Sequence, residues 1–193
     1  YTALFGWTVK DIPMGPDTVY TILTKNGADA AACYGRMPDM EAQGIPAHWM
    51  SYMSVASADE SAAKVKANGG TVLKEPFDIP GVGRMAALKD PAGAPFCVWE
   101  AKPHIGIGVM DEPNALMWTE LMTRDTAACE TFYRGVFGWG MKLWPMPAGA
   151  NYHLFMRGET PAGGMMTMTP DMAGVPSCWC VYFQVEHCDA MVA

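Results

Sequence analysis

Four side chains that could bind a metal ion lie close together near the end of the chain. Cys178 and Cys180 are separated by one residue, and His187 and Cys188 follow them. Zinc prefers thiolate and imidazole ligands, but a structural zinc site normally needs two such pairs at an ordered spacing. The segment around Cys178 and Cys180 has instead the apolar character of a core strand, which favours small buried thiols. We therefore predict no metal site in this segment.

All six cysteines of the chain are expected to be free. A chain of 193 residues that is 50% hydrophobic can bury a sizeable core, so it does not need a disulfide framework, and no signal peptide is visible. We expect mostly buried thiols in a reducing, cytoplasmic compartment. The cysteines are Cys33, Cys97, Cys129, Cys178, Cys180 and Cys188.

Glu120 is the main candidate for acid–base chemistry. It lies in the strand-like run 116–123, where alternation places it on the same face as Trp118 and Met122. Two interpretations stay open. Glu120 is either a general base or ligand anchor, or a structural carboxylate that accepts hydrogen bonds from the backbone or from a partner subunit.

The charge and hydropathy of the chain exclude two classes of partner. The net charge is -7 at pH 7, and Lys and Arg do not cluster as they do in nucleic-acid-binding proteins. No stretch reaches the roughly 18 apolar residues that a membrane-spanning helix needs. The expected partner is a small molecule, with neither nucleic acid nor a membrane.

An internal repeat organises the chain. Phe5-Gly6-Trp7 recurs 132 residues later as Phe137-Gly138-Trp139, and further matches follow in the same order. After a two-residue deletion in the second copy, the offset becomes 130. A co-linear series with one small gap indicates a duplication. The further matched pairs are Tyr1/Tyr133, Tyr20/Tyr152, Pro38/Pro170, Asp39/Asp171, Met40/Met172, Trp49/Trp179, Tyr52/Tyr182, Val55/Val185 and Asp59/Asp189.

The repeat also predicts domain boundaries. The second copy opens with the run 116–123, whereas the first begins inside the equivalent helix, and the second stops before its closing strands. We expect a first domain over residues 1–101 without its opening strand, a linker over 102–114, and a second domain over 115–193 without its C-terminal strands. The unpaired sheet edges of such a fragment favour a homo-oligomer.

Local signals place several elements. Asp125 is a suitable N-cap for a helix that runs to Phe137 and ends at Gly138. Ser57 and Glu60 have the spacing of a capping box at the start of a second helix. Short β-type runs cover residues 18–23, 49–55, 84–88 and 95–99. The alternation predicts an α+β fold of paired βαβββ modules.

Two sets of motifs resemble a known family. The first set is Thr123-Arg124-Asp125, followed by Phe132-Tyr133 and Phe137-Gly138-Trp139, and the second is the segment 78–84 with the turn Asp90-Pro91-Ala92-Gly93. Together they resemble the opening and closing strands of the glyoxalase/bleomycin-resistance/dioxygenase (vicinal oxygen chelate) superfamily, closest to its tandem-domain glyoxalase-like or hydroxylase members. The resemblance covers nearly the whole chain. It implies tandem domains whose mixed sheets curl into cups that bind small molecules.

The resemblance also implies where metal ligands would lie. Metal-dependent members place a His or Gln in the opening strand, a His in the fifth strand and a Glu after the closing turn. Carried over by motif, these positions are Trp118, Met50 or Cys180, and Cys97. Trp has no lone pair for a metal, and a thioether is a poor ligand for the ions concerned. We therefore expect cups without a metal or another cofactor, and no metal-dependent glyoxalase or dioxygenase mechanism.

The expected cup lining is aromatic and rich in sulfur, which suits a small apolar or aromatic ligand. We expect a metal-free binding module in the manner of bleomycin-resistance proteins. The alternative is an enzyme of lyase or dioxygenase type, which would use Glu120 or a metal site completed by segments outside this chain. The predicted ligand-binding residues are Met50, Tyr52, Cys97, Trp99, Trp118, Cys180 and Tyr182, with Glu120 as the catalytic candidate.

Overall fold

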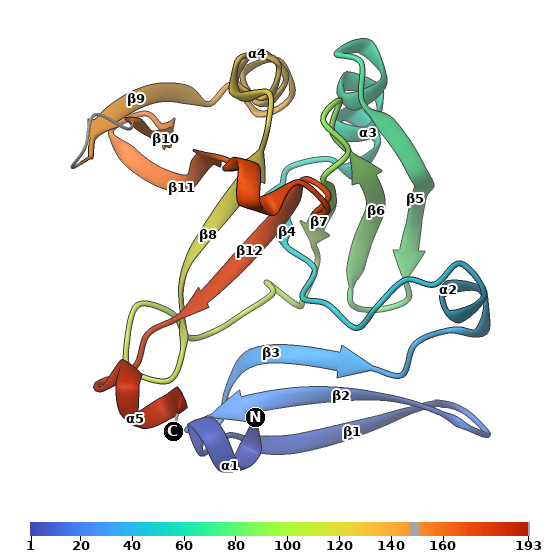
Figure 1. Ribbon diagram of the computed structural model, residues 1–193. Coiled ribbons are helices and arrows are strands. Elements are labelled where there is room, and N and C mark those ends of the chain that lie inside the picture. The colour runs from blue at the N-terminus through green and yellow to red at the C-terminus, as the bar shows by residue number, and fades with distance from the viewer. Residues whose placement is uncertain (147–150, 193) are drawn as a thin grey trace. The chain divides into compact units, whose positions relative to one another are not determined.

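The computed structural model describes residues 1–146 and 151–192 (Figure 1). The chain folds into two compact units, each of which combines segments that are distant in sequence. Unit 1 comprises Tyr1–Trp49, Ile105–Met117 and Tyr182–Ala193, and unit 2 comprises Met50–His104 and Trp118–Val181. The two domains expected over residues 1–101 and 115–193, with a linker at 102–114, stay a prediction.

Unit 1 contains a small antiparallel sheet in the order β1-β2-β3. The turn between β2 and β3 is Asn26-Gly27, in which both residues have positive φ, as a two-residue hairpin requires. The elements of this unit are α1 (Thr2–Phe5), β1 (Thr8–Gly15), β2 (Thr18–Lys25), β3 (Ala28–Tyr34), α2 (Pro38–Ala42) and α5 (Cys188–Val192).

Unit 2 contains two βαβββ modules of the same topology. The first module is β4 (Tyr52–Val55), α3 (Ala58–Ala67), β5 (Thr71–Ile79), β6 (Gly83–Lys89) and β7 (Pro95–Ala101). The second is β8 (Leu116–Thr123), α4 (Thr126–Phe137), β9 (Gly140–Pro145), β10 (Asn151–Arg157) and β11 (Thr160–Thr167), followed by η2 (Pro170–Met172) and β12 (Cys178–Phe183). β8 begins, and β12 ends, in segments that belong to unit 1.

The strand order is equivalent in the two modules. The sheets have the orders β4-β7-β6-β5 and β12-β8-β11-β10-β9. In each module the opening strand pairs in parallel with the last strand, β4 with β7 and β8 with β11. The pairs β7–β6, β6–β5, β11–β10 and β10–β9 are antiparallel. The expected α+β fold of paired βαβββ modules with mixed sheets is therefore confirmed.

The two long helices begin at the predicted caps. The Asp125 carboxylate accepts a hydrogen bond from Ala128 N at 2.9 Å, and Gly138 ends α4 in the left-handed conformation. The Ser57 hydroxyl accepts a hydrogen bond from Glu60 N at 3.2 Å at the start of α3. Both predictions are confirmed because cap and helix fall where the sequence placed them.

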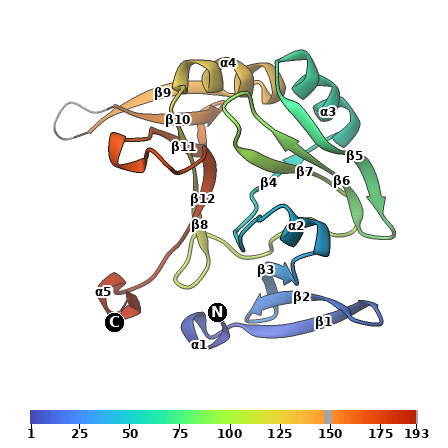
Figure 2. The ribbon, with the colours of Figure 1, turned by 45° about the vertical axis from the view of Figure 1, so that its right-hand side comes forward.

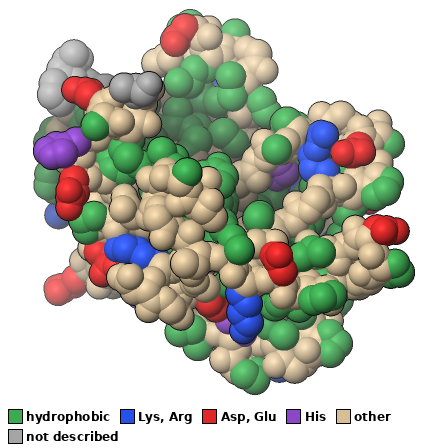
Figure 3. All heavy atoms as spheres, turned by 90° about the horizontal axis from the view of Figure 1, so that it is seen from below, with side chains coloured by type: hydrophobic (Ala, Val, Ile, Leu, Met, Phe, Trp, Pro, Cys, Tyr) green, Lys and Arg blue, Asp and Glu red, His purple; other side chains and the backbone are tan. Residues whose placement is uncertain are grey.

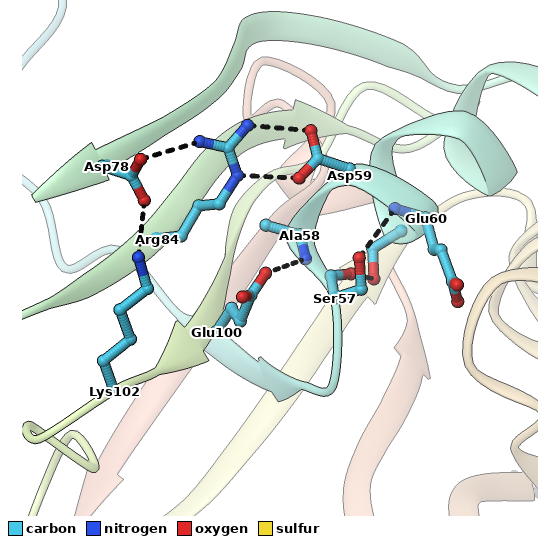
Figure 4. A network of polar contacts seen from close by, with 9 residues as sticks. Ser57, Ala58, Asp59, Glu60, Asp78, Arg84, Glu100 and Lys102 are labelled. Carbon is cyan, nitrogen blue, oxygen red and sulfur yellow. Dashed lines mark hydrogen bonds and ion pairs between the residues drawn. The ribbon is translucent and has the colours of Figure 1, made fainter.

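A cluster of charged side chains joins α3 to its sheet (Figure 4). Arg84 donates two hydrogen bonds to Asp59, at 2.7 and 2.8 Å, and lies 3.5 Å from Asp78. Lys102 donates to Asp78 at 2.9 Å, and Glu100 accepts from the backbone of the first helical residue. The hydrogen bonds from Arg84 and Lys102 lower the pKa values of Asp59 and Asp78. Because the carboxylates are exposed, this cluster orients α3 more than it stabilises the fold.

The main core of unit 2 lies between its two helices and its sheets. α3 and α4 lie side by side in both ribbon views (Figures 1 and 2). Their apolar faces share one core with the inner faces of both modules. The largest fully buried apolar and aromatic side chains are Tyr133, Phe96, Phe132, Phe155, Leu88, Leu121, Met165, Val65 and Val98.

A buried polar network crosses this core. Trp179 Nε1 donates to Tyr133 Oη at 2.9 Å, and Tyr133 Oη donates to Asp90 Oδ2 at 3.0 Å. Ala94 N donates to the other oxygen of Asp90 at 2.8 Å. Burial raises the pKa of Asp90 and raises that of Tyr133 well above its usual value. The network connects the turn between β6 and β7 to α4 and β12.

The duplication is visible in the geometry of matched aromatic residues. The rings of Tyr1 and Phe5 are 6.1 Å apart at 22°, and those of Tyr133 and Phe137 are 6.1 Å apart at 19°. Gly6 and Gly138 end their helices with φ of 69° and 70°.

The same correspondence extends to a hydrogen bond. Trp49 Nε1 donates to Tyr1 Oη at 3.2 Å, as Trp179 Nε1 donates to Tyr133 Oη. Matched residues therefore make equivalent contacts, although Tyr1 is exposed and Tyr133 is buried, and the repeat is confirmed.

The core of unit 1 is smaller. Phe5, Trp7, Leu23 and Ala30 are buried there, and Trp7 Nε1 donates to Asn114 O at 2.8 Å. Hydrophobic side chains also remain exposed, and Figure 3 shows them spread over the face seen from below. Among the described residues, no helix has both the length and the apolar character required to cross a membrane.

Candidate functional site

An apolar hollow of about 350 Å³ lies over two strands of unit 2. We call it the β9–β10 hollow, and its lining residues are Trp144, Met146, Tyr152 and Leu154. Tyr152 and Leu154 lie two positions apart on β10, and Trp144 on β9 is two positions from Met146, which directly follows that strand, because alternate side chains of an extended segment point to the same face. Tyr152 is directly opposite Trp144 in the pairing of β10 with β9. The lining is thus two aromatic rings, a thioether and an aliphatic chain.

Trp118 is connected to this hollow through Tyr152. Trp118 Nε1 donates to Tyr152 Oη at 2.8 Å, and both side chains are partly buried. Trp118 lies on β8 and Tyr152 on β10, on either side of β11. The predicted ligand-binding residue Trp118 therefore contacts the lining, although it is not itself one of the four lining residues.

Glu120 and two thiols form a neighbouring group on β8 and β12. The Sγ atoms of Cys178 and Cys180 are 3.9 Å apart. Burial raises the pKa of Cys180 to about 11, with further contributions from Cys178 and from the charge of Glu120. Glu120 is 6% exposed and is directly opposite Gly164 in the pairing of β8 with β11. The predicted base thus lies near a thiol that is protonated at neutral pH.

Three predicted residues come together on the sheet of the first module. Tyr52 is directly opposite Cys97 in the pairing of β4 with β7, and its side chain hydrogen-bonds to the Cys97 thiol. Trp99 lies two residues further along β7 and donates from Nε1 to His104 O at 2.9 Å. Burial raises the pKa of Cys97 to about 11. This face holds a buried thiol beneath a half-exposed phenol, and Met50 precedes the strand that carries Tyr52.

Tyr182 is the remaining predicted residue. It follows Cys180 by two residues on β12, is 44% exposed and belongs to unit 1.

The burial of the cysteines differs from the prediction. All six are free, as expected, but only Cys97 and Cys129 are buried. Cys178 and Cys180 are half-buried because Trp179, between them, occupies the core-facing position of β12. The expectation of buried thiols is therefore wrong for four of the six, Cys33, Cys178, Cys180 and Cys188.

A second hollow, of about 400 Å³, lies beside the turn at Pro91 and the start of α4. Its one cationic side chain, Arg124, donates to the backbone oxygens of Met172 and Val175. Asp125, which caps α4, lines the same hollow. Both charged side chains, Arg124 and Asp125, already hydrogen-bond to nearby backbone groups. We therefore interpret this hollow as a structural crevice.

The residues at the expected ligand positions do not fit a metal. Trp118 uses its only polar atom as a donor to Tyr152, and the Cys97 thiol has a raised pKa that opposes the thiolate form. Within residues 1–146 and 151–192, no three His, Cys, Asp or Glu side chains form a group that could hold a metal ion. No step that depends on a metal follows from these residues.

Sequence reasoning did not place Trp144, Met146, Tyr152 and Leu154 in the site. Tyr152 was recognised only as the repeat partner of Tyr20. The available signal was the alternation of Trp144 with Met146 and of Tyr152 with Leu154, which presents two apolar pairs on one face of a hairpin.

Comparison with known proteins gives consistent matches. A family model described as Glyoxalase/Bleomycin resistance protein/Dioxygenase superfamily matches residues 1–98. The chain is 39% identical over 194 residues to "Putative glyoxylase CFP32" of Mycobacterium tuberculosis, covering 100% of this chain and 73% of that protein. It is 33% identical over 210 residues to "Anthracycline biosynthesis protein DnrV" of Streptomyces peucetius, again covering 100% of this chain and 73% of that protein.

The fold also matches a solved structure. The Mn(II)-bound glyoxalase from Novosphingobium aromaticivorans superposes with a TM-score of 0.56 at 15% identity, over 96% of this chain and 60% of that chain. At this identity the likeness concerns the fold alone. The chain spans about 60% of the length of that structure.

Proposed function

Because this chain belongs to the glyoxalase/bleomycin resistance protein/dioxygenase superfamily, we propose that it binds a small apolar or aromatic molecule in the β9–β10 hollow without a metal. The observation that carries the proposal is the lining of the hollow by Trp144, Met146, Tyr152 and Leu154. Small-molecule sites are concave and mostly apolar, with a few placed polar groups. The hydroxyl of Tyr152, held by Trp118, is such a group.

The exposure of Trp144 supports a ligand at this place. Its side chain is 53% exposed. A ligand that covers an indole removes a large apolar area from water and gains stacking energy, together on the order of 1–3 kcal/mol.

The name of one relative agrees with an aromatic ligand. DnrV is named for anthracycline biosynthesis. Anthracyclines are flat polycyclic aromatic molecules, and a hollow walled by Trp144 and Tyr152 is suited to such a ring system. We therefore take a planar, fused-ring aromatic compound as the first ligand class to test.

The test is a titration with anthraquinone-2-sulfonate, a water-soluble planar compound, followed by tryptophan fluorescence and isothermal calorimetry. Trp144→Ala should weaken binding by roughly tenfold or more, which corresponds to about 1.4 kcal/mol. Leu143→Ala is the matched control, because Leu143 directly precedes Trp144 on β9 and is 54% exposed but alternates to the other face. Equal affinity for the wild type and Trp144→Ala would refute binding at this hollow.

A second candidate function is acid–base catalysis by Glu120. It is favoured by the burial of this carboxylate in the same sheet as Trp118 and beside Cys180. Glu120→Gln separates the two functions. The variant should bind the ligand with unchanged affinity if Glu120 is structural, and it should bind but not convert the ligand if Glu120 is a base.

A reducing, cytoplasmic location is part of the same proposal. It is supported by six free thiols, of which Cys178 and Cys180 lie close enough to contact one another without a bond.

A further inference from the structure

Gly164 lies where the side chain of Tyr152 crosses the sheet. Tyr152 starts on β10 and its hydroxyl reaches Trp118 on β8, so its ring must pass over β11, which lies between them. A Cβ atom on Gly164 would lie 1.8 Å from Tyr152 Oη and 2.4 Å from Cζ. It would also lie 2.9 Å from Trp118 Nε1. The hydroxyl end of the Tyr152 ring therefore lies directly over Gly164.

This close approach is the reason for a glycine at position 164. Gly164 is not among the glycines with positive φ, so its backbone conformation is open to other residues. What excludes a larger residue is the space for a side chain, which Tyr152 and Trp118 already occupy. Any larger residue would lift the Tyr152 ring toward the β9–β10 hollow and separate its hydroxyl from Trp118.

The first copy of the repeat shows the alternative arrangement. The lining residues Trp144, Met146, Tyr152 and Leu154 match Ile12, Met14, Tyr20 and Ile22 at the offset of 132. Gly164 matches Ala32, and the pairings agree, since Ala32 is opposite Ile22 as Gly164 is opposite Leu154. Tyr20 stacks on Tyr34, with ring centroids 6.2 Å apart at 21°. With a Cβ at this position, the matched tyrosine has a different aromatic partner.

We infer that Gly164 is a specificity-determining residue of the β9–β10 hollow, because it lets the Tyr152 side chain cross close over β11 and hold its ring in place as a platform for a planar aromatic ligand. The inference rests on the proposed function and adds to it the residue that makes the site selective for a planar ligand. An aromatic ring held in place presents a face for offset stacking, which a planar compound can use and a globular one cannot. The second copy therefore binds planar molecules, and the first copy, with Ala32, does not.

The test compares a planar and a globular anionic probe, anthraquinone-2-sulfonate and adamantane-1-carboxylate. Gly164→Ala should weaken binding of the planar probe by roughly tenfold and that of the globular probe by less than about twofold. Gly140→Ala is the matched control, because a Cβ there would make only ordinary contacts, the nearest at 3.7 Å. An equal loss for both probes, or no loss, would overturn the inference.

The effect should also depend on Tyr152. In a Tyr152→Ala background, Gly164→Ala should no longer change the affinity for the planar probe, because the displaced ring is absent. If Gly164→Ala alone fails to fold, the double variant should fold, since the two shortest contacts, at 1.8 and 2.4 Å, are with Tyr152, and the Trp118 ring, at 2.9 Å, needs to move by only a few tenths of an ångström. An undiminished effect in the Tyr152→Ala background, or a double variant that still fails to fold, would contradict the inference.

A measurement without ligand separates this inference from the proposed function. The Trp118 Nε1–H resonance in a ¹⁵N spectrum reports its hydrogen bond to Tyr152. Gly164→Ala should shift this resonance and speed its exchange with solvent, and Gly140→Ala should leave it unchanged. An unaltered Trp118 resonance in Gly164→Ala would overturn the role of Gly164. Loss of probe binding to the wild type would overturn the proposed function, and with it the ligand shape inferred here.

Discussion

Replacing Tyr133 with Phe should destabilise unit 2 by about 3 kcal/mol. The substitution removes only the hydroxyl and keeps the buried ring, so the void that it leaves is no larger than one oxygen atom. Without the hydroxyl, Trp179 Nε1 loses its hydrogen-bond acceptor and the Asp90 carboxylate loses one of its donors. Trp179 and Asp90 are both buried. A buried donor without an acceptor costs about 1–3 kcal/mol. At a pH above the folded-state pKa of Asp90, the hydrogen bond to this carboxylate is one to a charged group, which contributes about 1.5–3 kcal/mol. Both losses come from the same hydroxyl. We therefore expect the total loss of stability to be no larger than the sum of the two separate costs.

Urea unfolding followed by tryptophan emission measures this effect. With an m-value of about 2 kcal/mol/M, the midpoint should fall by roughly 1.5 M while the slope stays the same. The duplication supplies the control, Tyr1→Phe. Tyr1 accepts a hydrogen bond from Trp49 at 3.2 Å in the matched position, but it is 57% exposed. Water can replace its hydroxyl, so this variant should lose less than about 0.5 kcal/mol. Similar losses for Tyr1→Phe and Tyr133→Phe would refute the argument that burial determines the cost.

Two further predictions concern Asp90 and metal content. Burial raises the pKa of Asp90 above its ordinary value of 3.8, so the folded state keeps a proton that the unfolded state has lost. The contribution of Asp90 to stability is therefore complete below pH 3.8 and falls as the pH rises through the folded-state pKa. Relative to Asp90→Asn, the wild type should lose stability across that window in a series of urea titrations; a pH-independent difference would contradict this. Elemental analysis of protein purified without added metal should find no stoichiometric Zn, Fe, Mn or Ni, because Trp118, Met50 and Cys97 are unsuitable ligands. One tightly held metal per chain would show that the ligand positions were misplaced.

The sequence predicted those elements whose signals are local. The caps at Ser57 and Asp125 and the strand at 116–123 are correct because one or two side chains determine each of them. β4 is shorter than the predicted run 49–55 and begins at Tyr52, since Trp49 packs into the core of unit 1 instead. β1, β3, β5, β9, β10 and β11 were not located.

The missed strands explain the missed site. The alternation within β9 and within β10 does not by itself tell that the two strands pair, and it is this pairing that places Tyr152 opposite Trp144. The hairpin signal Asn26-Gly27 would have located β2 and β3, and the repeat would then have transferred them to β10 and β11. The role of Gly164 depends on a contact between three strands, which no local pattern records.

The duplication separates the requirements of packing from those of the ligand. At core positions the two copies hold the same residue types, with Phe5, Trp7 and Trp49 matching Phe137, Trp139 and Trp179.

On the face of the hollow the copies agree at two positions, where Met14 and Tyr20 match Met146 and Tyr152, and differ at others. Ile12, Ile22, Ala32 and Tyr34 match Trp144, Leu154, Gly164 and Met166. A core position must fill a fixed volume, so a change in size costs stability in either copy. A position that lines a hollow is free of that constraint and can change with the molecule it contacts. The positions at which the copies differ are therefore the ones to vary when the ligand of the second copy is sought.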